Sequence, residues 1–340
     1  MRILITGGAG LIGSRAAEFY AKKGDEVIIL DNLGRSKLFN SKEETVTHNL
    51  NWLKQFTNIQ YIEGDVCNKK DVKQAFGEGV DAVIHAAGQP GIRFSVQFPK
   101  KDFNINALGT LNVLECIRQV CPDATFVYCS TNKVYGENVN RILIRELDTR
   151  YEYRFVKGVA EHTDVDQTGH SLYGVSKYIG DLYVQEYAYS YGIKTAVFRM
   201  SCIYGTRQFG FEDQGWIAWF IISMLQGNII NIYGNGKQVR DALYVDDVVK
   251  AYDAFIKSDI PHGVWNIGGG IENSVSLLEL VAFLEEELSI KALLTFKDWR
   301  PFDQKIYISD INKVSKDLCW YPKISINTGC RKLIKWLKNR

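Results

Sequence analysis

The sequence predicts an α/β protein with a doubly wound parallel sheet and a smaller mixed α/β lobe. In the first half of the 340 residues, short β-branched runs alternate with longer helical patterns, and this alternation is typical of βαβ units. A glycine-rich turn at residues 7–13 joins the first run to the first helical pattern. After about Arg199, short elements mix with polar loops. Because parallel crossovers are right-handed, the βαβ units wind helices onto both faces of one sheet.

The individual elements follow from the hydrophobic periodicity. The expected strands are Arg2–Thr6, Glu26–Leu30, Ile59–Ile62, Ala82–His85, Thr125–Cys129 and Thr195–Arg199. The expected helices are Leu11–Lys23, Glu43–Phe56, Lys69–Phe76, Asn106–Val120 and Tyr173–Tyr191. We expect a Rossmann domain over residues 1–199 and a lobe over residues 200–340, partly interleaved with it. The lobe should close over the carboxyl ends of the strands, where such sheets bind ligands.

Composition excludes several classes of protein. Hydrophobic residues make up 46% of the chain and charged residues 24%, which suits a globular protein with a sizeable core. The net charge of +2 gives no reason to expect nucleic acid or an anionic membrane as a partner. The most apolar later stretch, Trp216–Leu225, is about half the ~20 residues that a membrane span needs. We therefore expect a soluble, cytoplasmic protein.

Cysteine and histidine usage argues against disulfides and metal sites. No Cys-x-x-Cys occurs, and the five histidines show no ligand spacing. An odd number of cysteines, several of them in apolar runs, is typical of reduced thiols in a cytosolic protein. We expect no metal. The seven cysteines are Cys67, Cys116, Cys121, Cys129, Cys202, Cys319 and Cys330.

The turn at residues 7–13 has the glycine spacing of a dinucleotide-binding loop, and it stands between a strand and a helix as that motif requires. Glycine lets the backbone approach a pyrophosphate, and the helix N-terminus offers free N–H groups to the anion. A glycine-rich surface turn is the alternative, and the flanking elements argue against it. The residues expected at the cofactor are Gly7, Gly10, Leu11, Ile12 and Gly13.

Asp31 ends the second expected strand, close to the ~20 residues beyond the loop at which such sites place an acid. A carboxylate there accepts hydrogen bonds from ribose hydroxyls and repels a 2′-phosphate. We therefore expect Asp31 and its neighbour Asn32 to contact the cofactor, and we expect NAD rather than NADP. Arg35 keeps NADP possible as the cofactor, because a guanidinium is suited to binding the 2′-phosphate of NADP.

Two further strand ends are expected to meet the cofactor. Asp65, with the backbone of Val66, follows the third strand and is placed to reach the adenine edge. A solvated aspartate is an alternative for Asp65. Ala86 and Ala87 follow the fourth strand, and their small side chains let the backbone lie against the cofactor. For His85, a packed structural role is the better interpretation.

Tyr173 and Lys177 are four residues apart within an expected helix, so their side chains share one face. An ammonium favours phenolate, and we expect Lys177 to lower the pKa of Tyr173 toward working pH. Such a tyrosine is able to take the proton of a substrate hydroxyl during hydride transfer. Thr131, after the fifth strand, is expected to hydrogen-bond the same oxygen. A solvated helix face is the alternative for the pair.

These motifs resemble the extended short-chain dehydrogenase/reductase family of nucleotide-sugar epimerases and dehydratases over nearly the whole chain. The resemblance implies a tightly bound NAD, Tyr173 as the base and Lys177 on the nicotinamide ribose. It also implies a nucleotide sugar as substrate and a homo-oligomer, a dimer or tetramer. The markers are Thr6–Gly13, His85–Ala87, Thr131, Tyr173–Lys177, Phe198–Arg199, Arg240–Asp241 and Arg300–Pro301.

The residues after Thr131 narrow the reaction. Dehydratases of this family carry Asp-Glu there, and they use the pair to remove a C5 proton and expel the C6 hydroxyl. This chain has Asn132 and Lys133, so the resemblance disfavours elimination and leaves epimerisation. Segments similar to the CDP-paratose 2-epimerases of the family are Ser130–Gly136, Tyr204–Phe209, Asp213–Trp216, Gly234–Asp241 and Trp299–Lys305. Many relatives have Phe-Arg-x-x-Asn where this chain has Phe198–Cys202, so the usual asparagine contact to the substrate diphosphate is absent or replaced.

Three arginines in the second-lobe loops are candidates for the substrate diphosphate, because a guanidinium fork matches that group. For Arg240 and Arg300 the family-like loops favour this role over a surface or structural one. For Arg207 the two interpretations stay open. We also expect Asn132, Lys133 and Gln208 at the sugar or nucleotide.

The resemblance therefore implies an NAD-dependent CDP-sugar 2-epimerase that oxidises C2 transiently and returns the hydride to the other face. CDP-paratose and CDP-tyvelose are the expected pair, and a CDP-glucose type of hexose stays open. Two alternatives stay open. One is a UDP-hexose 4-epimerase that uses the same residues at C4. The other, from a different class, is a non-catalytic NAD-binding regulator, which the presence of both Tyr173 and Lys177 argues against.

Overall fold

The computed structural model describes residues 1–39, 44–301 and 303–340. Glu43, the first residue of one expected helix, and Phe302, in the loop of Arg300, lie outside these residues. The chain divides into two compact units. The first comprises residues 1–131, 171–199 and 249–265, and the second comprises residues 132–170, 200–248 and 266–340. Each unit is therefore built from three separate stretches of the chain. The chain passes from the first unit to the second directly after Thr131.

The first unit is an α/β unit. Its elements, with parts of β8, α10 and β12 extending beyond it, are β1 (Arg2–Thr6), α1 (Leu11–Lys22), β2 (Glu26–Asp31), α2 (Arg35–Phe39), α3 (Glu44–Leu53), β3 (Ile59–Glu63), α4 (Lys69–Phe76), β4 (Ala82–His85), α5 (Ile92–Gln97), α6 (Pro99–Phe103), the π-helix η1 (Asn104–Leu108), α7 (Gly109–Val120), β5 (Thr125–Thr131), α8 (Ser171–Tyr191), β8 (Thr195–Met200), α10 (Val245–Lys257) and β12 (His262–Ile267).

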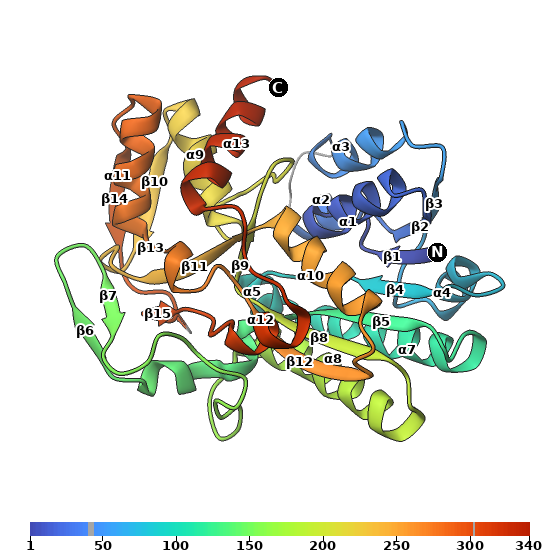
Figure 1. Cartoon of the computed structure of the whole chain (residues 1–340). Coiled ribbons are helices and arrows are strands. Elements are labelled where there is room, and N and C mark those ends of the chain that lie inside the picture. Colours follow the sequence, from blue (N-terminus) through green and yellow to red (C-terminus); the bar gives the residue numbers. More distant parts are fainter. Residues whose placement is uncertain (40–43, 302) are drawn as a thin grey trace. The chain divides into compact units, whose positions relative to one another are not determined.

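Its seven strands form one sheet in the order β12-β8-β5-β4-β1-β2-β3 (Figure 1). The pairs from β3 through β5 are parallel, with Ile5 opposite Ile29 on one side and Ile84 on the other. The chain order reverses between β1 and β4, which is the switch point where such sheets bind dinucleotides. Every residue of β4 and β5 is buried, because a parallel sheet is covered on both faces. The predicted Rossmann fold is confirmed.

The structure changes two predicted boundaries near the expected site. The strand predicted to end at Cys129 continues to Thr131. The helix predicted over Asn106–Val120 instead begins as the π-helix η1, from which α7 continues. Single turns of π-helix commonly occur at functional sites, and the buried Asn106 in this turn bonds to Gln89, Asp102 and Ser176.

The second unit is a smaller mixed α/β unit. Its elements, together with the first residues of α10, are the 3₁₀ segment η2 (Asn132–Arg141), β6 (Ile144–Glu146), β7 (Tyr151–Tyr153), β9 (Cys202–Tyr204), α9 (Trp216–Gln226), β10 (Ile229–Tyr233), β11 (Val239–Tyr244), the 3₁₀ turn η3 (Ile271–Asn273), β13 (Ser274–Ser276), α11 (Leu277–Leu288), β14 (Leu293–Lys297), β15 (Ile306–Tyr307), α12 (Asn312–Leu318) and α13 (Ile326–Lys338).

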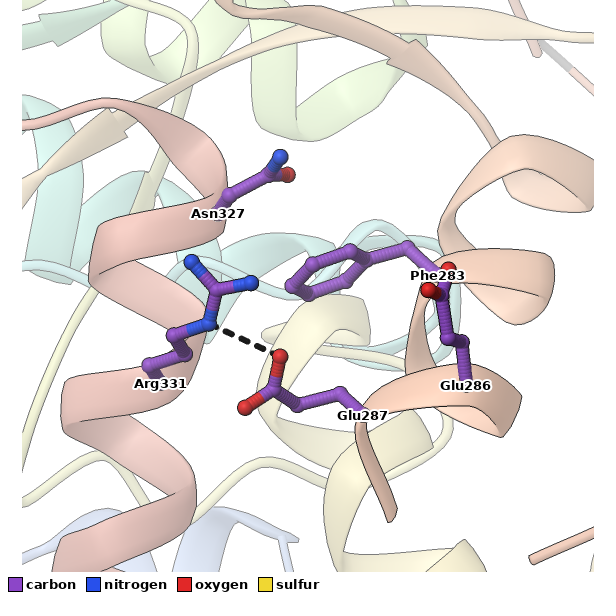
Figure 2. Close-up of a pocket in the computed structure, with 5 residues that line it drawn as sticks. All are labelled: Phe283, Glu286, Glu287, Asn327 and Arg331. Carbon is purple, nitrogen blue, oxygen red and sulfur yellow. Dashed lines mark hydrogen bonds and ion pairs between the residues drawn. The ribbon is translucent and has the colours of Figure 1, made fainter. Parts of the chain in front are cut away.

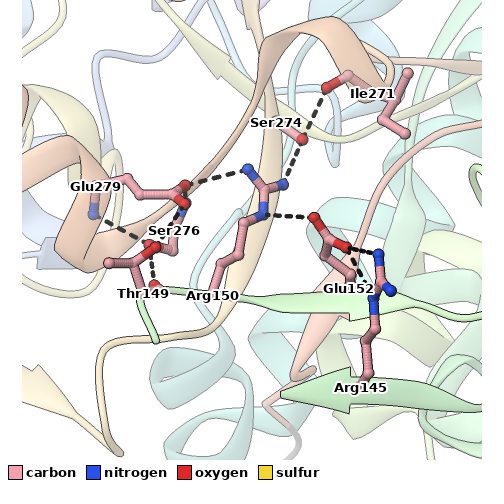
Figure 3. A network of polar contacts seen from close by, with 8 residues as sticks. All are labelled: Arg145, Thr149, Arg150, Glu152, Ile271, Ser274, Ser276 and Glu279. Carbon is pink, nitrogen blue, oxygen red and sulfur yellow. Dashed lines mark hydrogen bonds and ion pairs between the residues drawn. The ribbon is translucent and has the colours of Figure 1, made fainter. Parts of the chain in front are cut away.

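Within this unit, β11 is the central strand, pairing with β9, β13 and β15. A polar network fastens the β6–β7 hairpin to the start of α11 (Figure 3). Arg150 contacts Glu279 at 3.2 Å and the Ser274 hydroxyl at 2.7 Å. Ser276 and Glu279 form a capping box at the start of α11, and the Ser276 hydroxyl also donates to the carbonyl of Thr149. The network has a structural role, because it caps the start of α11 and ties this helix to the hairpin.

No helix in the described part of the chain has both the length and the apolar character needed to span a bilayer.

Candidate active site

The turn between β1 and α1 makes a cradle that only glycine permits. Gly7 has a φ of +69°, and a Cβ there would lie 2.6 Å from the backbone nitrogen of Ala87. A Cβ on Gly13 would lie 2.2 Å from the carbonyl oxygen of Gly7. Helix α1 begins after Gly10 without a side-chain cap, so its first N–H groups, which include those of Leu11 and Ile12, keep no partner within the helix. This backbone fits a dinucleotide pyrophosphate.

The end of β2 is tied to the same turn. Asp31 accepts hydrogen bonds from the N–H groups of Ala9, at 2.9 Å, and Leu33, at 2.8 Å. Burial raises the pKa of its carboxyl group, and these two bonds oppose that effect. Asn32 donates from its side chain to Asp65 at 2.9 Å. The acid expected at the ribose therefore also fixes the shape of the glycine turn.

The ends of β3 and β4 complete the cradle. Asp65 accepts from the N–H of Cys67 at 2.8 Å, and the carbonyl of the buried Val66 accepts from Asn112. Ala86 and Ala87 lie against Gly7, so the small residues at these positions lie where the fold brings two backbones together. Contacts of Asp65, Val66, Ala86 and Ala87 with a cofactor stay predictions.

His85 is fully buried. Its two ring nitrogens lie 2.7 Å from the hydroxyl oxygen of Thr6 and 3.1 Å from that of Thr110. Burial lowers the pKa of His85 to about 3, and the charge of Lys177 acts in the same direction. His85 is therefore a neutral packed residue of the first unit.

Thr131, Tyr173 and Lys177 all belong to the first unit. Thr131 is the last residue of β5, and the other two lie on successive turns of α8. Burial raises the pKa of Tyr173 to about 12, while a side-chain hydrogen bond with Thr131 opposes the rise. The prediction that Lys177 lowers this pKa toward working pH is wrong for the protein alone, because the desolvation of the phenol outweighs every favourable contact.

Lys177 is buried beside Tyr128, whose ring centroid lies 4.2 Å from the Lys177 ammonium. Burial lowers the pKa of Lys177 to about 8, and Cys129, Asp181 and Asp102 raise it by their charges. Thus the ammonium faces an aromatic ring, and the carboxylates act on it from farther away.

A buried amide and acid network underlies this part of α8, and sequence reasoning missed it. Asn106 in η1 donates to the Ser176 hydroxyl at 3.0 Å and to Asp102 at 3.1 Å. Gln89 donates to Asp102 at 2.6 Å, and its backbone N–H donates to Asn106 at 2.8 Å. The contact between Asn106 and Ser176 joins residues 70 positions apart, and Gln89 and Asn106 are 17 positions apart, so no local sequence signal marks the network.

Asn132 and Lys133 begin the second unit. Asn132 donates to the Gln304 side chain at 3.4 Å. Burial lowers the pKa of Lys133 to about 8, the charge of Arg240 lowers it further, and Asp303 raises it. Arg240 and Asp303 form an ion pair of 2.6 Å. Lys133, Arg240 and Asp303 therefore form one cluster with two cationic groups and one carboxylate, and we call it the Lys133 cluster.

Arg300 lies in a second cluster of the same unit. Its guanidinium contacts Asp213 at 3.1 Å and lies 3.9 Å from the centre of the Tyr233 ring. The Glu212 carboxylate accepts from the Tyr233 hydroxyl at 2.8 Å and from Asn231 at 2.9 Å. Arg300 thus lies against an aromatic ring, with an acid beside it.

Arg207 and Gln208 are both buried. Arg207 adopts a left-handed backbone with a φ of +66°, which costs energy for a residue with a side chain and often marks a functional loop. Gln208 donates to the carbonyl of Ile203 at 3.3 Å. Their roles in substrate binding stay predictions.

Cys202, at the position where the family resemblance implied an asparagine, accepts a hydrogen bond from the Trp216 indole at 2.9 Å. The neighbouring Ser201 bonds to the buried Asp241. Both side chains therefore serve contacts within the second unit.

A pocket lies elsewhere on the second unit, between α11 and α13 (Figure 2). It is lined by Phe283, Glu286, Glu287, Asn327 and Arg331. Arg331 and Glu287 form an ion pair of 2.8 Å across it. No residue predicted for the site lies in this lining, so we do not assign it to the active site. Within residues 1–39, 44–301 and 303–340, no cluster of three or more metal-ligating side chains occurs, and the seven cysteines are free thiols.

Comparisons with known proteins match this architecture. The sequence model of the NAD dependent epimerase/dehydratase family matches residues 3–268. The chain is 40% identical to a CDP-paratose 2-epimerase of Salmonella typhi, over 99% of both chains. This chain belongs to the NAD-dependent epimerase/dehydratase family. The predicted family and its NAD cofactor are confirmed.

Other members of the family are similar over their whole length. A putative UDP-glucose 4-epimerase of Methanocaldococcus jannaschii is 34% identical over 99% of this chain and 98% of its own. A crystal structure of the UDP-glucuronic acid 4-epimerase of Bacillus cereus, in complex with UDP-glucuronic acid and NAD, is 27% identical, with a TM-score of 0.84 over 100% of this chain and 99% of its own. The protein is therefore an NAD-dependent member of a family of nucleotide-sugar epimerases and dehydratases.

Proposed function

We propose that this chain is a CDP-hexose 2-epimerase that works by transient oxidation of the sugar at C2. CDP-paratose and CDP-tyvelose are the favoured substrate pair, with a CDP-glucose type of hexose as a further candidate. The observation that carries the proposal is the 40% identity to a CDP-paratose 2-epimerase over 99% of both chains.

The catalytic groups proposed are those at the end of β5 and on α8. When bound, NAD supplies the acceptor and donor of hydride and, in its oxidised form, a positive charge that favours phenolate. Tyr173 takes the proton of the C2 hydroxyl and later returns it. Thr131 forms a hydrogen bond to the oxygen of the same hydroxyl and so orients it. Lys177 holds the nicotinamide ribose. The hydride removed from C2 returns to the opposite face of the 2-keto sugar, so no outside oxidant is consumed.

The residues after Thr131 support epimerisation over dehydration. Elimination needs an acid and a base beside the sugar. Asn132 carries an amide that does neither at ordinary pH, and Lys133 is a cation within the Lys133 cluster. A dTDP-glucose 4,6-dehydratase of Escherichia coli is also similar, at 27% identity, and this pair of residues is our reason for setting that reaction aside.

The two arginine clusters of the second unit are proposed to bind the nucleotide sugar. The Lys133 cluster brings two cationic side chains together, and cationic hydrogen-bond donors suit a diphosphate. Arg300 is oriented by Tyr233 and Asp213 and is proposed as a second contact to the same group. Asn132, Arg207 and Gln208 are proposed at the sugar or the nucleotide.

The test is product analysis by NMR after incubation of the purified protein with a panel of CDP-hexoses. We expect inversion at C2. With deuterium at C2 of the substrate, we expect the label to remain at C2 of the product. Extensive exchange of C2 with solvent would instead indicate proton abstraction and would contradict the hydride mechanism.

A UDP-hexose 4-epimerase is the second candidate, because a putative UDP-glucose 4-epimerase is 34% identical over nearly the whole chain. The same Thr131, Tyr173 and Lys177 would then serve C4. Assays of CDP- and UDP-hexoses side by side separate the two. Turnover of UDP-glucose to UDP-galactose without turnover of any CDP-hexose would favour the second candidate.

A further inference from the structure

The ammonium of Lys177 has an unusual environment for a catalytic cation. Lys177 is 5% exposed, and within the described residues no carboxylate forms an ion pair with it. A buried charge that lacks a paired carboxylate needs some other compensation to remain in place. The groups close enough to affect it are Tyr128 and Cys129 on β5, Asp181 on α8, Asp102 on α6 and His85 on β4.

Tyr128 makes two direct contacts with this residue. Its ring centroid lies 4.2 Å from the Lys177 ammonium nitrogen, well within the ~6 Å at which a cation is attracted to a ring face. Its hydroxyl donates to the backbone carbonyl of Lys177 at 3.1 Å. One side chain on β5 thus contacts both the charged end and the backbone of Lys177.

The surroundings fix Tyr128 in this orientation. The side chain is fully buried, and the His85 ring stacks on it with centroids 5.9 Å apart and planes at 18°. Gly180, three residues after Lys177, leaves the space for the phenol: a Cβ there would lie 2.3 Å from the Tyr128 hydroxyl oxygen. Close packing on several sides therefore holds the ring beside the ammonium.

We propose that Tyr128 is a positioning residue for Lys177, whose ring face holds the buried ammonium in place through a cation–π contact. It acts through Lys177 and does not itself touch reacting atoms. This inference goes beyond the proposed function, because it holds for any reaction that uses the charged form of Lys177.

The direction of the effect follows from the contact. A ring face attracts the charged form of lysine only, so it raises the pKa of Lys177. Burial acts in the opposite direction and brings the pKa to about 8. Weakening the ring's negative face at constant shape should therefore lower the pKa further.

The experiment replaces Tyr128 with phenylalanine and with its mono-, di- and trifluorinated forms. Fluorine withdraws electron density from the ring face and changes its size little. The readout is the pKa of Lys177 in the intact protein, measured by NMR of lysines labelled with ¹³C at Cε. The signal is assigned with Lys177→Arg.

We expect the pKa of Lys177 to fall stepwise with each fluorine, by roughly one unit from phenylalanine to the trifluoro form. The matched internal control is Lys194, whose ammonium lies 5.3 Å from the Phe255 ring centroid; its pKa should stay constant. A constant pKa of Lys177 across the series would overturn the proposal. Because the measurement needs no substrate, it stands or fails independently of the CDP-hexose assay.

Discussion

The carboxylate of Asp181 and the guanidinium of Arg199 form a two-pronged ion pair inside the first unit, with contacts of 3.0 and 3.1 Å. Asp181 is fully buried and lies on α8, and Arg199 lies on β8. Asp181 also accepts a hydrogen bond of 2.7 Å from Ser130, the residue before Thr131. The ion pair therefore joins α8, the helix of Tyr173 and Lys177, to β8, and the bond from Ser130 joins the same helix to the strand of Thr131.

Removal of one partner of this pair should be costly. We expect Asp181→Ala to lower the free energy of unfolding by about 3–5 kcal/mol, because it removes the carboxylate that compensates the buried Arg199 charge. Urea denaturation followed by circular dichroism measures the change. The control is the double variant Asp181→Leu with Arg199→Met, which removes both charges and should be less destabilised than the single variant. An equally destabilised double variant would contradict the reasoning.

The glycine turn allows a matched test of the cofactor cradle. Gly7 and Gly192 both have a φ of +69°, but a Cβ at Gly192 meets nothing within 4 Å, whereas at Gly7 it meets the backbone of Ala86 and Ala87. Gly192→Ala should cost only the strain of about 1–2 kcal/mol. Gly7→Ala should in addition abolish binding of NAD, because the turn has to open.

Titration of NAD followed by calorimetry measures this difference. Equal NAD affinity in the two glycine variants would show that the cradle does not depend on the approach of Gly7 to β4.

His85 should make stability depend on pH. Its pKa of about 3 in the folded protein is far below the ordinary ~6.5. At a pH between these two pKa values, the His85 ring is protonated in the unfolded chain and neutral in the folded protein. The free energy of unfolding should therefore fall as the pH drops from about 6.5 toward 3, with a slope from this residue of up to about 1.4 kcal/mol per pH unit.

Comparison of the protein with His85→Gln isolates this slope. Urea denaturation between pH 4.5 and 7 should show a weaker pH dependence in the variant, although the variant is less stable throughout. Parallel curves would mean that His85 takes up its proton in the folded state.

Lys133 should make substrate affinity depend on pH. With a pKa of about 8, its ammonium is lost as the pH rises above that value, while a bound diphosphate favours the charged form. The affinity for CDP should fall above pH 8, by at most about tenfold per pH unit. Calorimetric titration between pH 7 and 9.5 measures this. The Lys133→Met variant should bind CDP more weakly at pH 7, and its affinity should no longer fall above pH 8. If the affinity of the variant still falls in this range, a group other than Lys133 is responsible.

Tyr173→Phe should reduce turnover by about 10²–10⁴-fold, because it removes the group proposed to transfer the proton and leaves the ring. NAD binding should remain, which calorimetry checks. Thr131→Ser, which keeps a hydroxyl, should retain more turnover than Thr131→Val. Turnover of the phenylalanine variant at the unaltered rate would remove Tyr173 from the mechanism.

Much of the first unit was predictable because its signals are local. The apolar run of β1 and the glycines after it stand within thirteen residues, and their spacing alone requires a strand, a turn and a helix. Tyr173 and Lys177 share a face because four residues make about one helical turn. Asn106 was not predictable as part of the buried network, since its partners Gln89 and Ser176 come from other segments.

The sequence by itself determined the sheet, the glycine-rich turn and the presence of Thr131, Tyr173 and Lys177, since each follows from short-range periodicity or spacing. Only the tertiary structure decided how readily Tyr173 and Lys177 ionise. Burial raises the pKa of Tyr173 and lowers that of Lys177, and burial depends on which distant segments cover a side chain. The Tyr128 ring reaches Lys177 across 49 residues of sequence, so no local pattern records the contact.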